Sequence, residues 1–384
     1  MTSNTTLSLA STICLSVAVP AVAVESAPEA EVEKVYVIPL YGQMGTDIHP
    51  DIYKDVIKDA KEVQPDLIVF HLKSADIDTN FHIQNDDRRE FGLWQNMEMY
   101  RDMMTELKSE LPRNAEQIMW IEDAVGPSTL LALGWSDIYM TEQARLWGLN
   151  AVQRFADGWQ DPDVRAKMYA AWVGIASGFA EAGGYPLELT WAMIEPNRKL
   201  GVTFEGREVV WQDDLEGTIW TVDGDPERVT RFESDSAENV MLSKGTAVDL
   251  QDLMFLRGYR EGGYEEQNSG KEIVEEYIED WRRAFARCES LNKDARDRLA
   301  GGTIADLGAA KSAKEKILSA ARRYPAVAAR LQQDYGIDMD GLIFEIETLK
   351  KQIADNRRGR RSGSSRGSKR GRGGGGLGGS LGGD

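Results

Sequence analysis

The chain has 384 residues, of which 42% are apolar, and its formal net charge at pH 7 is -18. This composition is typical of a folded globular protein with a substantial core, and it excludes a wholly disordered chain. There are two cysteines. Cys14 lies in a predicted leader, so Cys288 alone would remain in the mature chain and no intramolecular disulfide is expected.

The first residues have the pattern of a secretory signal peptide. An uncharged apolar run over residues 7–19 is followed by Pro20 and a small-x-small site that ends at Ala23. We therefore expect residues 1–23 to be removed near Ala23, and the mature protein to be exported to the periplasm or cell envelope. The run is too short to span a bilayer comfortably, but it would act as an anchor if it were kept. An acidic linker over residues 24–33 follows.

From residue 34 onward, strand-like and helix-like segments alternate. Predicted strands occupy residues 34–42, 67–72, 117–123 and 137–140, and predicted helices occupy residues 50–63, 93–111 and 128–135. The run at 67–72 is continuously apolar, as in a parallel strand that is covered on both faces. The alternation predicts an α/β fold with a mostly parallel sheet and crossover helices.

The second half of the chain changes character. A long helix is expected over residues 161–184, because it has an acidic start and a Gly-Gly stop. A short helix over 185–196 and a β-hairpin over 207–222 follow. Charged amphipathic helices are then predicted up to residue 356, the last with an apolar stripe expected to pack on another helix: Leu342, Ile343, Ile346, Leu349 and Ile353.

The last residues, 357–384, form a biased segment of their own. They hold eight Arg or Lys residues against one acidic residue, Asp384, and almost no apolar side chains. Such a composition predicts a disordered tail. An acidic body with a basic tail suggests two separate physical roles.

Four stretches resemble one family when taken in order. "KVYVIPLYGQM" and "QPDLIVFHLKS" are similar to the opening strands of the ClpP/crotonase superfold, and most closely of its SppA and NfeD-type signal-peptide-peptidase branch. "STLLALGWSDIYMTEQARLWGL" is similar to its small-residue helix and following strand, and "AKMYAAWVGIASGFAEAGGYP" to the helix with its general base. The resemblance implies a ClpP/crotonase-like domain over 34–265, and the pattern and composition of the rest of the chain predict a helical region over 266–356 and the tail over 357–384.

In that family, a Ser-Lys dyad cuts peptide bonds, and backbone N–H groups at a glycine pair bind the oxyanion. The resemblance places Lys167 at the general-base position, although an ordinary solvated lysine is an equal alternative. Gly126 occupies the serine position, and Ser128 lies two residues later, where it would serve as a helix-entry residue. The oxyanion-hole positions hold Asp76 and Ile77, which lack the backbone freedom of glycine.

No cofactor or metal site is predicted. The three histidines, His49, His71 and His82, match no zinc spacing, and His71 is expected to be a hydrogen-bonded core residue. Cys288 lies in a helix-like stretch and has no cysteine partner, so a packed or surface role is expected rather than a nucleophilic one.

Three functions remain open on the sequence. The leading hypothesis is an exported pseudo-peptidase that binds a peptide or a protein partner and forms a homo-oligomer. The enzymatic alternative is an active serine peptidase that uses Ser128 and Lys167. The third is an envelope scaffold whose basic tail contacts a polyanion or a membrane surface, nucleic acid being an unexpected partner for an exported chain.

Overall fold

The computed structural model describes residues 32–74, 96–223, 225 and 227–367. Its main sheet has seven strands, in the order β10-β1-β2-β3-β5-β9, with β4 paired to β3. All pairs are parallel except β5 with β9. The strands are β1 (Glu33–Tyr41), β2 (Leu67–Ser74), β3 (Glu116–Val125), β4 (Ile138–Met140), β5 (Arg145–Trp147), β9 (Phe232–Glu233) and β10 (Tyr264–Gln267). The predicted α/β fold with a mostly parallel sheet is confirmed.

Helices begin and end where local chemistry favours it. In α1 (Pro50–Val63), Pro50 fits the first turn and the His49 side chain accepts a hydrogen bond from Asp51 N. In α7 (Pro162–Ala182), the Asp161 carboxylate caps the first turn, and Gly183 ends the helix. The remaining helices of this region are α4 (Met97–Glu110), α5 (Pro127–Leu133), α6 (Ala151–Ala156), α8 (Leu187–Ile194), α9 (Ser234–Asn239) and α10 (Leu250–Leu256).

The sheet separates two apolar cores. On one face, side chains such as Ile38, Phe70 and Ile121 pack with helices that include α1, α4 and α5. On the other face, Val69 and Trp120 belong to a smaller core that α10 covers. The central strands are thus buried on both faces, as their continuous apolar runs predict.

A second sheet corrects one prediction. The expected hairpin over 207–222 is wrong, because β7 (Glu208–Gln212) and β8 (Trp220–Asp223) do not pair with each other. Both pair antiparallel with β6 (Leu200–Glu205), which lies between them. The tight turn joins β6 to β7 at Gly206, whose positive φ suits a two-residue turn.

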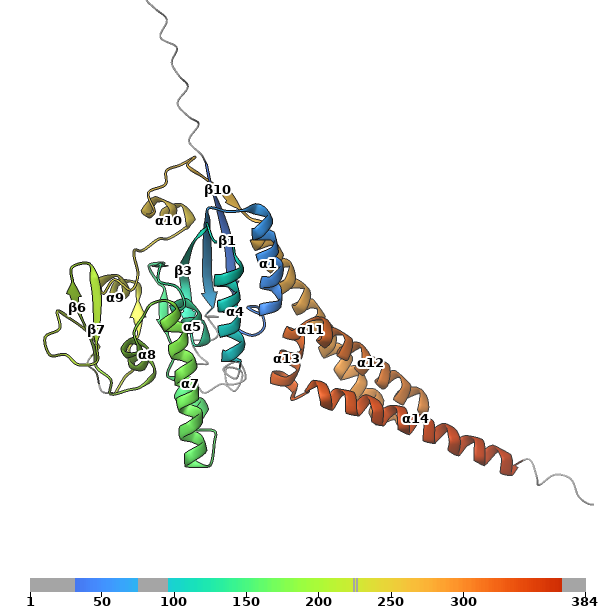
Figure 1. Cartoon of the computed structure of the whole chain (residues 1–384). Helices are drawn as coiled ribbons and strands as arrows, with labels where there is room; N and C mark the ends of the chain where they lie inside the picture. Colours follow the sequence, from blue (N-terminus) through green and yellow to red (C-terminus); the bar gives the residue numbers. More distant parts are fainter. Residues whose placement is uncertain (1–31, 75–95, 224, 226, 368–384) are drawn as a thin grey trace, which may run out of the picture.

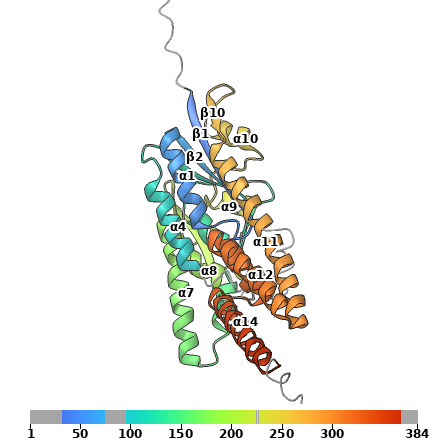
Figure 2. The same ribbon diagram turned by 90° about the vertical axis from the view of Figure 1, so that its right-hand side faces the viewer.

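The C-terminal helices form an arm that projects from the α/β body (Figure 1). They are α11 (Ser269–Gly301), α12 (Ile304–Arg323), α13 (Pro325–Tyr335) and α14 (Met339–Gly367). Seen from the side in Figure 2, α11, α12 and α14 lie next to one another. Leu342, Ile346 and Leu349 are buried as predicted, whereas Ile343 is exposed.

The arm also corrects the boundary of the predicted disordered tail. The helix α14 continues to Gly367 instead of ending at residue 356, and the positions from 368 onward lie outside the described residues. The predicted leader over 1–23 lies outside them as well. Among the helices that are described, none has the length and apolar character needed to span a membrane.

Candidate functional site

Ser128 lies at the carboxyl end of β3, where the chain turns into α5. Gly126 makes the turn with a φ of 77°, a conformation that favours glycine, and Pro127 opens the helix. The turn packs closely against the loop that contains Gly148. A Cβ placed on Gly148 would lie only 2.7 Å from Gly126 N. This backbone geometry fixes where the Ser128 hydroxyl can point.

The Ser128 side chain is buried, with an exposed fraction of 0%. Its Oγ lies 2.9 Å from Ser74 O and 3.1 Å from Val125 O, so the hydroxyl donates to backbone carbonyls at the ends of β2 and β3. Thr129 is equally buried and donates to Ala124 O and Trp147 O. Both hydroxyls therefore connect the helix entry to the sheet.

Lys167, the predicted general base, lies in the first third of α7 and is exposed. The hydrogen bonds and ion pairs found in the described parts of the chain include none between Ser128 and Lys167. The structure therefore does not bring the two into hydrogen-bond contact. The predicted oxyanion-hole positions, Asp76 and Ile77, lie outside the described residues, as does His82.

A largely buried ion pair lies beside this turn. Arg145 on β5 faces Asp123 on β3, with Nε 3.0 Å from Oδ1 and a second contact between Nη2 and Oδ2. The side chains are only 19% and 16% exposed. Burial raises the pKa of Asp123 above its usual range, against the opposing effect of Arg145. The Arg145 and Arg231 guanidinium groups both lie over the Trp147 ring.

A second polar cluster, which sequence reasoning missed, occupies the carboxyl ends of the first three strands. The Tyr41 hydroxyl lies 2.6 Å from His71 Nδ1, and His71 Nε2 lies 3.3 Å from Glu122 Oε2 without hydrogen-bond alignment. Lys73 contacts the other Glu122 oxygen, and the His71 ring stacks on Trp120. His71 thus lies at the edge of the core, with polar partners on both sides.

The charges of this cluster are coupled. His71 is the largest influence that lowers the pKa of Glu122, and Lys73 adds to it, so that the pKa falls to about 2 despite burial. The pKa of Tyr41 is raised to about 12. Burial is the larger cause, and nearby carboxylates, among them Glu122, add to it. At neutral pH the cluster therefore holds an ionised Glu122 and a protonated Tyr41. The signal for this cluster was available in the sequence, since all four side chains lie at or just after the ends of predicted strands.

The remaining candidates have structural partners. Cys288 is buried among apolar side chains of the arm, and burial raises the pKa of its thiol to about 11, as expected for an unreactive cysteine. His49 caps α1, as described above. Within the described ranges, no group of three or more His, Cys, Asp or Glu side chains is arranged to hold a metal ion.

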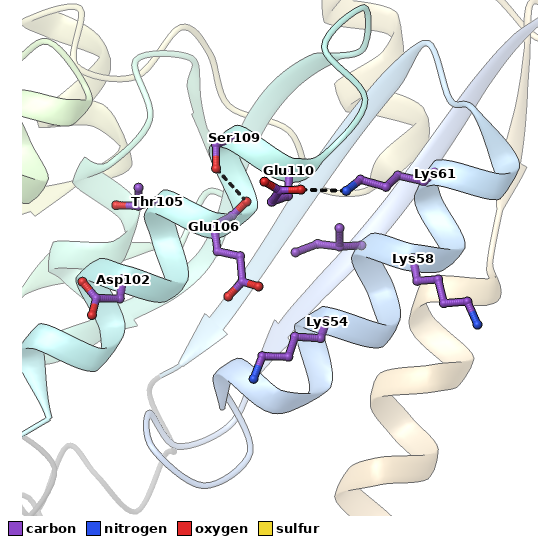
Figure 3. Close-up of a pocket in the computed structure, with 9 residues that line it drawn as sticks. Lys54, Lys58, Lys61, Asp102, Thr105, Glu106, Ser109 and Glu110 are labelled. Atoms are coloured by element: carbon purple, nitrogen blue, oxygen red, sulfur yellow. Dashed lines mark hydrogen bonds and ion pairs between the residues drawn. The ribbon is translucent and has the colours of Figure 1, made fainter.

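An open groove between α1 and α4 brings opposite charges together (Figure 3). Lysines line one side and carboxylates the other, with Ile57 between them. Lys61 Nζ lies 2.8 Å from Glu110 Oε2, and Lys54 pairs with Asp51. Because its charges are exposed and partly paired across the groove, this feature is a solvated contact between two helices rather than a catalytic site.

No protein-family model matches the chain, and no curated protein matches it. Among solved structures, the chain is similar to a lysine-to-alanine mutant of the 1510-N membrane-bound stomatin-specific protease in complex with a substrate peptide, at 14% identity and a TM-score of 0.34. That match covers 59% of this chain and 80% of the other. A serine-to-alanine mutant of the same protease gives the same identity, TM-score and coverage of this chain, with 84% of its own length covered. A third structure is the 1510-N membrane protease specific for a stomatin homolog from Pyrococcus horikoshii, at 12% identity and a TM-score of 0.28, with 58% and 78% coverage.

Proposed function

We propose that the α/β domain is a ClpP/crotonase-fold relative of the SppA/NfeD-type peptidases that binds peptides or partner proteins without cleaving them. The observation that carries the proposal is the state of the Ser128 hydroxyl. It has no exposed surface, and its proton is donated to backbone carbonyls. A serine nucleophile must present its oxygen to the substrate and give its proton to a base, and Ser128 meets neither condition here.

The environment of Lys167 supports the same proposal. A lysine general base must lie in a place that excludes water and contacts the nucleophile, but Lys167 is exposed to solvent. An active Ser-Lys peptidase that uses Ser128 and Lys167 would require α5 and α7 to rearrange together. The turn opposes such a change, because Pro127 fixes the backbone at the start of α5.

A covalent probe separates the two functions. We expect the purified chain to react with a fluorophosphonate probe no more than its Ser128→Ala variant does, and to leave labelled casein, an unfolded protein, uncut. Fluorescence anisotropy should still detect binding of the casein. Labelling at Ser128 that disappears in Lys167→Ala would establish the peptidase instead. Absence of both labelling and casein binding would contradict the peptide-binding function.

The far end of α14 favours a second candidate function, contact with an anionic polymer or lipid headgroup. Ile353 of α14 packs on the arm, and the helix continues beyond it with Arg357 and Arg358 exposed. The rest of the basic segment follows directly in the sequence. Basic side chains on such an extension can neutralise phosphate or carboxylate groups, with an affinity that falls as salt rises.

Removing residues 357–384 tests this second function. We expect the truncated chain to elute from a heparin column at a clearly lower salt concentration than the full chain, because the acidic remainder repels the polyanion. The melting temperature should stay unchanged, since the deleted residues lie beyond Ile353, which packs on the arm, and Arg357 and Arg358 are exposed. If both chains elute at the same salt concentration, the basic segment does not bind polyanions.

A further inference from the structure

We infer that the groove between α12 and α14 is the surface through which two copies of this chain associate. The inference concerns the arm and is independent of the function proposed for the α/β domain. Three apolar side chains line the groove together with charged and polar ones. It is lined by Glu315, Leu318, Ser319, Arg322, Ile343, Ile346, Glu347 and Lys350.

The apolar side chains of this region are more exposed than folding of the arm alone requires. Leu342 and Ile346 are buried against α12, but Ile343 is 36% exposed and Phe344 is 73% exposed. Phe344 has the largest exposed fraction among the large apolar side chains of the described residues. It follows Ile343 on the outer side of α14, about 100° further around the helix. Phe344 does not line the groove itself, but an aromatic side chain this exposed, next to the groove-lining Ile343, is typical of a contact that another protein surface covers.

The charges on α12 favour a second copy as the partner. Glu315 and Arg322 are seven residues apart, so they lie two turns apart on one face of the helix, with Ser319 between them. A two-fold axis that passes beside α12 at the level of Ser319, between the two copies, runs the two α12 helices antiparallel. It places Glu315 of each copy opposite Arg322 of the other. Arg322 is exposed and has no ion-pair partner within the described chain, whereas Glu315 pairs with Lys311 of its own helix, so the contact would add a second cation to Glu315.

This arrangement satisfies the requirement of a symmetric interface, in which the same patch must be complementary to itself. The helices α12 and α14 of one copy would pack on the same two helices of the other, so that four helices surround Leu318, Ile343 and Ile346. The arm projects from the α/β body, and this leaves room for a second arm beside it (Figure 1).

The groove fits other occupants less well. The chain's own segment beyond residue 367 is basic and nearly free of apolar side chains, whereas Arg322, Lys350 and three apolar side chains line the groove. An anionic membrane surface would favour a lining of uniformly positive charge, but Glu315 and Glu347 also line the groove. A second copy of the groove carries positive and negative residues in its own lining, so it can complement both charge signs.

Sedimentation velocity of the full chain over a range of concentrations tests the inference. We expect a dimer, and we expect Phe344→Asp to raise its dissociation constant by about tenfold or more, because a carboxylate would replace an aromatic contact. The control is Phe255→Asp on α10, where the native side chain is 59% exposed but lies on the α/β body. This control should dimerise like the native chain.

A charge exchange identifies the symmetry. Arg322→Glu alone should weaken the dimer, because it faces Glu315 of the other copy. The combination of Glu315→Arg with Arg322→Glu should restore it, an effect that a purely structural role of either residue would not produce. Circular dichroism melting checks that every variant is folded. A native chain that stays monomeric up to about 100 µM, or a dimer that neither Phe344→Asp nor Arg322→Glu weakens, would overturn the inference.

Discussion

Replacing Gly183 by alanine is expected to destabilise the α/β domain by about 3 kcal/mol. Gly183 ends α7, and a Cβ at this position would lie 2.1 Å from Leu133 O at the end of α5. The obstacle is backbone, so no side chain can turn away to make room. The two helices would have to separate, and α5 is the helix that carries Ser128. Urea unfolding followed by circular dichroism gives the change in the free energy of unfolding.

A second glycine of the same helix provides the control. A Cβ on Gly174 would meet no atom within 4 Å, and its backbone is helical. Gly174→Ala should therefore stabilise the protein by up to about 1 kcal/mol, since alanine has the higher helix propensity. If Gly183→Ala unfolds at the same urea concentration as the native protein, the close approach of α5 and α7 does not exist in solution.

The central elements of the fold were predictable because their patterns are local. The continuous apolar runs of β2 and β3, and the Pro50 and Asp161 starts of α1 and α7, are signals within one segment. The strand β10 was missed because it is short and polar, and its strand character comes from pairing with β1. The hairpin was assigned wrongly because β6 contains Gly201, which interrupts its strand pattern and conceals the partner of β7 and β8.

The candidate site was less predictable, because its properties depend on distances through space. The sequence placed Ser128 at a helix entry, and this is its position in the structure. Nothing local indicated that the hydroxyl would donate to Ser74 O, a backbone group 54 residues earlier. The exposure of Lys167 likewise depends on how α7 packs. The roles of both residues in function stay predictions until the probe experiment is done.

Replacing Asp123 by alanine is expected to cost about 3 kcal/mol of unfolding free energy. Its carboxylate faces the Arg145 guanidinium at two points, and both side chains are mostly buried. Removal of the carboxylate takes two contacts away from a guanidinium in a place that water reaches poorly. An exposed pair gives the matched control: Glu279→Ala, whose partner Arg283 is 67% exposed, should change stability by about 0.5 kcal/mol or less.

The double variant of Asp123→Ala with Arg145→Met tests whether removing both charges costs less stability than removing the carboxylate alone. Burial raises the pKa of Asp123 and Arg145 opposes this, so the carboxylate lies where its charged form is poorly hydrated. Removal of both charges should therefore recover most of the stability lost in Asp123→Ala. A loss in Asp123→Ala no larger than that of Glu279→Ala would contradict this account.

The same double variant can be compared with the native chain for casein binding. If it regains stability but binds labelled casein more weakly than the native chain does, the pair positions β3 and β5 for binding. Casein binding that returns together with stability would instead assign the pair a role in folding alone.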